Sequence, residues 1–245
     1  MLNLDSETCF LIVSHNGNWD VLNGLKYNFS KYDFHVNNMF VLMNSKDLAF
    51  SFQNAEFISV KKGDWKTEMY EGLSFLTNLG YKKMILWLDD FYLTKKVDLE
   101  GLSKLLDENN EKKYLGLRRQ SNISICSYKL IINSKVKKVD INFPYYTSLK
   151  SAYWDLEYFK VKLKSCENIW HFEKMRNSNT LHYEVSKSVI SYWHTVEKGK
   201  WKYYTPILFK EEYNMVKGNR ALESNRLFLA NIDLIRFLKL KLIGY

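Results

Sequence analysis

The feature that most constrains the fold is the run KMILWLDDFYL at residues 83–93, in which apolar residues lead directly into two aspartates. Residues 84–88 are too few to span a membrane and too continuously apolar for a half-exposed strand. They predict a central strand covered on both faces, as in sheets flanked by helices. In open α/β sheets, ligands bind beyond the carboxyl ends of the strands, which is where Asp89 and Asp90 stand.

The two adjacent carboxylates need an explanation, because like charges at this distance repel each other. A divalent cation or a ribose bound between Asp89 and Asp90 would relieve the repulsion. Alternatively, Asp89 begins a turn and Asp90 caps the segment that follows, as aspartates often do. The residues alone leave both interpretations open.

The chain before this run alternates apolar strands with amphipathic helices. We expect strands at 8–14, 39–43 and 56–60, and helices at 19–32 and 63–79. This order predicts an α/β fold with a mostly parallel sheet of the nucleotide-binding type and right-handed crossovers. Beyond it we expect a helix from residue 98, a strand at 114–119, short strands and loops over 121–150, mainly helix from 153 onward, and a long terminal helix at 221–245.

Composition indicates one structural unit. The 245 residues are 46% hydrophobic, which supplies a large core, and only two prolines and ten glycines leave little room for linkers. We expect a main domain over residues 1–205 with a helical extension over 206–245 packed on it. Three widely spaced cysteines favour free thiols in the cytoplasm over a zinc site. We expect neither a signal peptide nor a membrane-spanning segment.

The net charge of +9 favours a polyanionic partner: nucleic acid, nucleotide phosphates or an anionic membrane surface. The lysines are scattered along the chain, as on an ordinary solvated surface. The sequence lacks a recognition-helix cluster, an aromatic RNA-binding strand motif and a basic arm, so we expect no nucleic-acid partner. A basic nucleic-acid-binding or processing protein remains the alternative, and an inactive α/β scaffold is a third interpretation.

Four stretches along residues 8–205 carry a family resemblance. They are VSHNGNWDVLNG, LMNSKD, ILWLDDFYLTKKVDLEGLSKLL and SLKSAYWDLEYFKVKLKSCENIWHFE. In their order and spacing they resemble bacterial polysaccharide-cluster glycosyltransferases of the GT-A type. The resemblance implies a GT-A-like, Rossmann-type fold and the transfer of a sugar from a nucleotide-diphosphate donor to a growing surface glycan, such as capsule, O-antigen or lipooligosaccharide. The implied acceptor is a glycan or a lipid-linked glycan.

In this resemblance, Asp89 and Asp90 take the place of the DXD-type motif, which holds the donor diphosphate through Mn²⁺ or Mg²⁺. A hard divalent cation can bind carboxylate and phosphate oxygens together. We expect Asp90 to face the metal and to be catalytic, and Asp89 to bind the ribose or to support the metal site. The sequence Asp89-Asp90-Phe91 is not a literal D-x-D, which leaves metal dependence open.

Glu173, in the stretch ENIWHFEKM, is the candidate catalytic base. A carboxylate beside bulky aromatics such as Trp170 and Phe172 has a raised pKa, as a general base at neutral pH requires. The alternative is an exposed glutamate in contact with Arg176. The resemblance of WHFE to the acceptor-side motif of the family favours the base, which would deprotonate the acceptor hydroxyl in an inverting transfer.

Several other polar residues are candidates for contacts to the nucleotide sugar. A turn or helix start next to a strand end places a side chain where a nucleotide enters, although turn formation and favourable charge at a helix N-terminus explain the same residues. Guanidinium, imidazole and ammonium groups suit a diphosphate. The candidates are His15, Asn16, Asp20, Asp89, Arg118, His194 and Lys200.

The expected terminal helix ends in LIRFLKLKLIGY, which mixes apolar residues with Arg236, Lys239 and Lys241. Such a segment suits the anionic inner face of the cell membrane, where lipid-linked acceptors are presented. We therefore expect a cytoplasmic protein that associates peripherally with the membrane. Packing of this helix on the domain is the alternative.

Overall fold

A computed structural model describes residues 1–44, 51–119, 135–142, 146–176, 180–216, 218 and 220–223. Four strands near the start of the chain form the parallel half of its central sheet. They are β1 (Thr8–Val13), β2 (Met39–Met43), β3 (Glu56–Ser59) and β4 (Lys83–Leu88), in the spatial order β3-β2-β1-β4. The chain runs outward from β1 to β3 and then returns to the other side of β1. This reversal creates a topological switch point between β1 and β4.

The second half of the eight-stranded sheet is mixed. Four more strands extend the sheet beyond β4: β8 (Ala152–Asp155), β6 (Tyr114–Gly116), β9 (Tyr183–Val185) and β7 (Val136–Lys138). β8 is antiparallel to both of its neighbours, β6 and β9 are parallel, and β7 is antiparallel to β9. The α/β class and the largely parallel sheet predicted from the sequence are confirmed.

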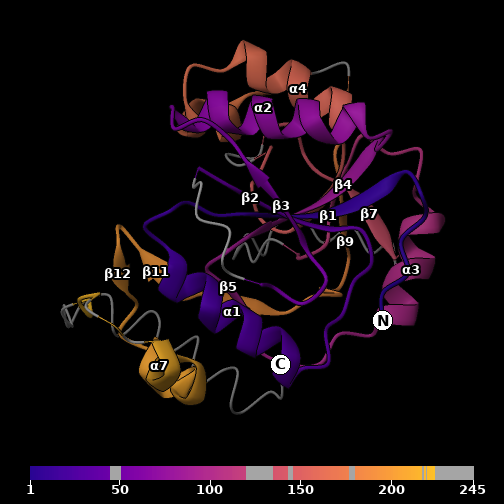
Figure 1. Cartoon of the computed structure of the whole chain (residues 1–245). Coiled ribbons are helices and arrows are strands. Elements are labelled where there is room, and N and C mark those ends of the chain that lie inside the picture. The colour runs from indigo at the N-terminus through magenta and orange to yellow at the C-terminus, as the bar shows by residue number, and fades with distance from the viewer. Residues whose placement is uncertain are drawn as a thin grey trace.

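Helices cover both faces of this sheet (Figure 1). α2 (Trp65–Asn78) and α4 (Leu156–Ser165) lie over one face, and α1 (Trp19–Lys31) and α3 (Leu99–Asp107) pack against the other. Alternate residues of β1 enter opposite cores, since Phe10 packs in the cluster of α1 whereas Leu11 packs in that of α2. The strand is therefore apolar throughout because both of its faces are covered.

The sequence prediction of mainly helix from residue 153 onward is wrong at its start and holds only in part beyond it. Tyr153 and Trp154 lie in β8, where both rings are buried on opposite faces of the sheet. Aromatic residues suit a strand covered on both faces, and this preference prevailed over the helical spacing. The later chain mixes short helices and strands: α5 (Ile169–Lys174), β10 (Tyr192–His194), β11 (Val196–Glu197), β12 (Lys200–Trp201), α6 (Thr205–Leu208) and α7 (Lys210–Val216).

The run 83–93 is not one strand. It breaks at a turn formed by Asp89 and Asp90, after which β5 (Phe91–Leu93) leaves the sheet and pairs antiparallel with β10. β11 and β12 form a further hairpin directly after β10. The aspartates therefore stand where the chain leaves the central sheet.

The last described segments pack on the main body. Glu212 of α7 is fully buried and accepts hydrogen bonds from Asn28 of α1 (3.0 Å) and Lys31 (3.4 Å). The terminal helix expected from residue 221 does not begin there, since Leu222 forms a parallel bridge with Trp201. Residues 224–245 lie outside the described residues, as do 120–134 and 143–145 of the expected strand-and-loop region.

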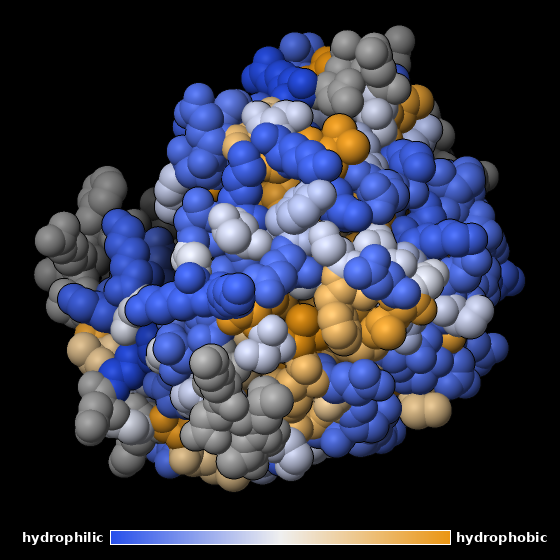
Figure 2. All heavy atoms as spheres, turned by 45° about the horizontal axis from the view of Figure 1, so that its top comes forward, coloured by the Kyte–Doolittle hydropathy of each residue, from blue (hydrophilic) through white to orange (hydrophobic). Residues whose placement is uncertain are grey.

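The face of the molecule shown in Figure 2 is mostly hydrophilic and has few large apolar areas. No helix among the described residues is both long and apolar enough to cross a bilayer. Cys9 and Cys166 are buried free thiols, and Cys126 lies outside the described residues.

We expect His182 to make the protein sensitive to acid. Its ring is fully buried and stacks on Tyr146, and Nε2 lies 2.7 Å from the Tyr158 hydroxyl. Burial lowers the pKa of His182 to about 4, whereas an unfolded histidine titrates near 6.5. The unfolded state therefore binds the proton first, and the free energy of unfolding should fall by roughly 3 kcal/mol as the pH drops from 6.5 to 4.

Urea denaturation between pH 7.5 and 4 would measure this effect in wild type and in His182→Gln. The variant should be less stable at pH 7.5 but should lose less stability toward acid. Equal slopes against pH in the two proteins would show that His182 does not control the acid response.

Candidate functional site

The candidate site lies at the switch point, where the ends of β1 and β4 meet. Ser14, directly after β1, donates a hydrogen bond to Oδ2 of Asp89 (2.6 Å). Asn18 donates to the same oxygen through Nδ2 (2.9 Å). The side chain of Asp89 is thus tied to the β1–α1 loop, and the residue is only 6% exposed.

The surroundings of Asp89 favour the protonated form of its carboxyl. Burial raises its pKa to about 7, with a further contribution from the neighbouring charge of Asp90. The hydrogen bonds from Ser14 and Asn18 and the charge of Arg220 oppose this increase only in part. A cation next to Asp89 would therefore stabilise its ionised form.

Asp90 is held from the other side, by the strand that pairs with β5. Its Oδ2 lies 3.2 Å from Nδ1 of His194, and its backbone oxygen accepts a hydrogen bond from the backbone N–H of Thr195 (2.9 Å). The His194 ring packs edge-on against Phe91, with ring centroids 4.5 Å apart. The predicted candidates Asp89, Asp90 and His194 are thus brought together.

A cavity of about 280 Å³ opens beside the two aspartates. Three segments far apart in the sequence close it: the β1–α1 loop, the β11–β12 hairpin and the chain near residue 220. Its lining residues are His15, Gly17, Asn18, Asp89, Asp90, Val196, Glu197, Lys198, Gly199 and Arg220. Clefts at switch points are where open α/β sheets bind ligands.

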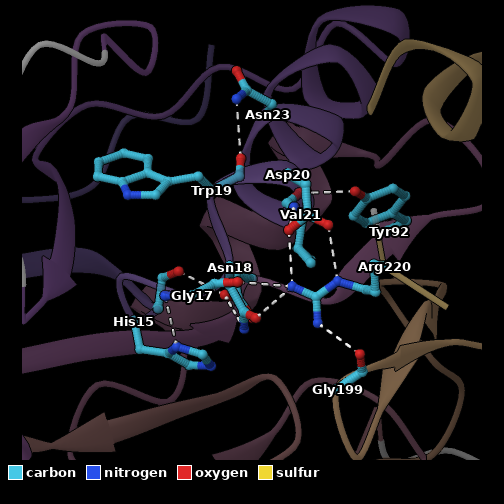
Figure 3. A network of polar contacts seen from close by, with 12 residues as sticks. His15, Gly17, Asn18, Trp19, Asp20, Val21, Asn23, Tyr92, Gly199 and Arg220 are labelled. Carbon is cyan, nitrogen blue, oxygen red and sulfur yellow. Dashed lines mark hydrogen bonds and ion pairs between the residues drawn. The ribbon is translucent and has the colours of Figure 1, made fainter. Parts of the chain in front are cut away.

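Arg220 lines this cavity and, like Asn18, is not among the candidates predicted from the sequence (Figure 3). Its guanidinium forms a two-point ion pair with Asp20, with 2.8 Å from Nε to Oδ2 and 2.8 Å from Nη2 to Oδ1. Asp20 also accepts a hydrogen bond from the N–H of Val21 in the first turn of α1. A single arginine 200 residues away from its partner leaves no pattern in the sequence that could have revealed it.

The remaining candidates in the β1–α1 loop differ in position. His15 lines the cavity, and burial lowers its pKa, as does the charge of Arg220. Asn16 is exposed and is not among the lining residues; its N–H donates to Asn44 Oδ1 after β2 (3.0 Å). This hydrogen bond connects the loop after β1 to the end of β2.

Two basic candidates lie outside the cavity. Lys200 is in β12, whereas Lys198, in the turn of the same hairpin with φ of 50°, is the lysine that lines the cavity. The guanidinium of Arg118 stacks on the buried ring of Tyr192 at 4.5 Å. Neither Arg118 nor Lys200 is among the residues that line the cavity.

Glu173 lies in α5, near enough to His194 for a charge on that ring to act on its carboxyl. The N–H of Leu149 donates to its Oε1 (3.1 Å), and burial raises its pKa, which a positive charge on His194 counteracts. The raised pKa predicted for Glu173 is confirmed. The expected cover by Trp170 is wrong, because this ring is 69% exposed, and Arg176 donates to Asn142 instead of pairing with Glu173.

The donor set at the aspartates fits a hard divalent cation. Within the described part of the chain no three His, Cys, Asp or Glu side chains form a cluster that could hold a metal by themselves. Mg²⁺, however, is commonly bound through one or two carboxylates together with substrate phosphates, and Mn²⁺ also prefers such oxygen ligands. Ser14 and Asn18 both donate to Oδ2 of Asp89, and no described residue donates to its Oδ1.

Comparison with known proteins gives no family for this chain. No family model and no curated protein matches the sequence. Among solved structures, S. aureus TarS 1–349 is similar with a TM-score of 0.49 and 13% identity, over 89% of this chain and 67% of that chain. A UDP-glucose pyrophosphorylase complexed with UDP-glucose has a TM-score of 0.48 and 8% identity, over 87% of this chain and 99% of that chain.

A cytidylyltransferase from Leptospira borgpetersenii serovar Hardjo-bovis has a TM-score of 0.40 and 11% identity, over 69% of this chain and 68% of that chain. A complex of TarS 1–349 with UDP scores 0.44 at 13% identity. Similarity at this level does not identify a reaction, so the function is argued from the site.

We expect Asp89→Asn to stabilise the ligand-free protein at neutral and alkaline pH. The folded pKa of Asp89, about 7, exceeds its unfolded value, so the contribution of this group to stability is complete below pH 4 and is lost as the pH rises through 7. Asparagine keeps an oxygen that can accept from Ser14 and Asn18 but carries no charge. The gain at pH 8 should reach up to about 4 kcal/mol.

Chemical denaturation of wild type and Asp89→Asn at pH 5 and pH 8 would measure this difference. Asp33→Asn is the control, since Asp33 is an exposed partner of Lys96. A variant that is less stable than wild type at pH 8 would mean that the charge of Asp89 is fully compensated in the native protein.

Proposed function

We propose that this protein is a GT-A-like glycosyltransferase that moves a sugar from a nucleotide-diphosphate donor to an acceptor hydroxyl, assisted by Mn²⁺ or Mg²⁺. The observation that carries the proposal is the pair of aspartates at the switch point, one of them buried with a raised pKa, beside a cavity. A donor diphosphate brought with a divalent cation would neutralise this pair. The same site without a cation would repel phosphate.

Donor binding would use residues from both sides of the cavity. Asp89 and Asp90 would hold the cation, with Asp89 oriented by Ser14 and Asn18, and Asp90 by His194. Lys198 would add positive charge at the cavity wall. When bound, the cation would stabilise the negative charge that develops on the departing nucleoside diphosphate.

The acceptor would be activated by Glu173. Its Oε1 is held by the Leu149 N–H, and no described residue donates to Oε2, which leaves that oxygen to take the proton of the acceptor hydroxyl. Burial keeps the pKa of this carboxyl above its usual range, as suits a base working near neutral pH. A charge on His194, which contacts Asp90, also acts on the carboxyl of Glu173, and this supports placing the acceptor near the donor site.

The acceptor class and the location of the protein remain predictions. The prediction that the acceptor is a growing bacterial surface glycan rests on the sequence resemblance. Association with the inner membrane face depends on residues 224–245, which lie outside the described part. The alternative of a nucleic-acid-binding protein is less consistent with this cavity, where two carboxylates face the space that phosphates would occupy.

Thermal unfolding with nucleoside diphosphates tests the proposal directly. We expect at least one of UDP, GDP, CDP, ADP and dTDP to raise the melting temperature in Mn²⁺ or Mg²⁺, and EDTA to abolish the increase. Hydrolysis of the corresponding nucleotide sugars with and without EDTA would then identify the donor. Retention on heparin or DNA without any nucleotide effect would favour the nucleic-acid alternative.

We expect Asp90→Asn to abolish cation-dependent donor binding while the fold is kept, because asparagine preserves the shape but not the charge. Calorimetry with the stabilising nucleotide and Mn²⁺ measures the loss, and Asp33→Asn serves again as the charge control. Near wild-type affinity at saturating Mn²⁺ in Asp90→Asn would remove Asp90 from the metal site.

We expect Glu173→Gln to keep donor binding but to lower transfer by roughly a hundredfold to ten-thousandfold, the usual cost of losing a general base. Glutamine can still accept the hydrogen bond from Leu149. Donor affinity and transfer rate should be measured on one sample. Weakened donor binding would indicate a donor-side role, and an unchanged rate would exclude Glu173 as the base.

A further inference from the structure

The guanidinium of Arg220 is almost fully used by acceptors of the protein itself. Besides the two bonds to Asp20, Nη1 donates to Gly199 O (3.1 Å), and Nη2 donates to Gly17 O and to Asn18 Oδ1 (both 2.9 Å). Arginine has five N–H groups, and Nη1 holds the one that has no acceptor among the described residues. The side chain therefore lines the cavity without being free to clamp a phosphate with its usual fork.

The bond to Asn18 fixes the orientation of that amide. Because Oδ1 of Asn18 accepts from Arg220, Nδ2 must point the other way, and it donates to Oδ2 of Asp89 at 2.9 Å. A continuous chain of hydrogen bonds thus runs from Arg220 through Asn18 to the buried carboxylate. A flipped amide would present its oxygen to the carboxylate of Asp89 and would repel it.

Asn18 stands at the N-cap of α1, and its side chain does not cap the helix. An N-cap asparagine normally accepts a hydrogen bond from the second or third N–H of the helix, which stabilises the helix. Here the amide is engaged by Arg220 and Asp89 instead. The Asn18 side chain therefore makes contacts on the cavity side and does not stabilise the N-terminus of α1.

Arg220 also joins the three segments that close the cavity. Gly17 belongs to the β1–α1 loop, Gly199 to the β11–β12 hairpin, and Arg220 to the chain that follows α7 (Figure 3). Asp20 accepts from two nitrogens of the guanidinium, and its position in the first turn of α1 is fixed by the helix. Asp20 therefore determines where the guanidinium lies.

We propose that Arg220 is a positioning residue for the cation site: anchored by Asp20, it orients the Asn18 amide, which in turn holds Asp89 in place for the divalent cation. This proposal rests on the proposed function, and it changes the role expected for Asp20 from a nucleotide contact to the anchor of Arg220. Lysine could not replace Arg220, because a single ammonium group cannot reach the five acceptor atoms in this planar arrangement.

A double-mutant cycle on Arg220 and Asn18 tests the proposal. The Mn²⁺ concentration that gives half-maximal binding of the nucleotide would be measured by calorimetry for wild type, Arg220→Met, Asn18→Ala and the double variant. Residues that support metal ligands typically contribute 10–100-fold to metal affinity. We expect a rise of roughly tenfold or more in each single variant, and little further rise in the double variant, because both act on Asp89 through one path.

Two further variants show whether Arg220 acts through its position or through its charge, and whether poor folding explains the result. Arg220→Lys keeps the charge and should behave like Arg220→Met. Asp20→Asn keeps Arg220 but loosens its anchor, and it should shift the Mn²⁺ dependence in the same direction, which gives a second test if Arg220→Met folds poorly. Lys96→Met removes an exposed ion pair with Asp33 beyond the far end of α1 and should change nothing.

The amide signal of Asn18 gives a readout that needs neither metal nor nucleotide. In ¹⁵N-edited spectra, the Nδ2 protons, assigned by their loss in Asn18→Ala, should move toward the position of a solvated amide in Arg220→Met and in Asp20→Asn. An unmoved signal, or additive effects on the Mn²⁺ dependence, would overturn the proposal. Wild type that binds no nucleotide in Mn²⁺ would instead refute the proposed function, and the amide signal would still decide the role of Arg220.

Discussion

The burial of the Asp89 carboxylate between β1 and β4 is the interaction on which the site depends. A carboxylate in this place is costly, since burial and the charge of Asp90 both favour its protonated form. Ser14 and Asn18 reduce that cost by donating to the same oxygen. Because these donors come from the loop after β1, the β1–α1 connection is fixed relative to the end of β4. The positions of His15, Gly17 and the start of α1 follow from this arrangement.

The sequence sufficed to predict the parallel half of the fold and the place of the aspartates. Local patterns carry this information: the apolar runs of β1, β2 and β4 are buried on both faces, and an acidic pair directly after β4 is visible without any tertiary contact. The backbone forms a turn at residues 89 and 90, as one of the two interpretations of the aspartate pair predicts. The side chains nevertheless face the cavity, so a turn and a ligand site are compatible here.

What could not be predicted is non-local. The pairing of β5 with β10 joins Phe91 to His194 and so brings His194 to Asp90. The strand character of residues 152–155 depends on burial between β4 and β6, which aromatic spacing does not reveal. Arg220 reaches the cavity through the packing of α7 on α1, fixed by the buried Glu212. Lys200 and Arg118 carry the right charge, but neither lines the cavity: Lys200 lies in β12, and Arg118 stacks on the ring of Tyr192.

Under the proposed function, two carboxylates with no third His, Cys, Asp or Glu in a cluster among the described residues require the cation and the diphosphate to bind as partners. The cation alone would have too few ligands for high affinity, and the diphosphate alone would meet two negative charges. Each would therefore strengthen the binding of the other by the same factor, as thermodynamic linkage requires. His194 contacts Asp90, and a charge on its ring also acts on Glu173. Under the proposed function, the donor site is therefore complete only when the cation and the nucleotide are both bound.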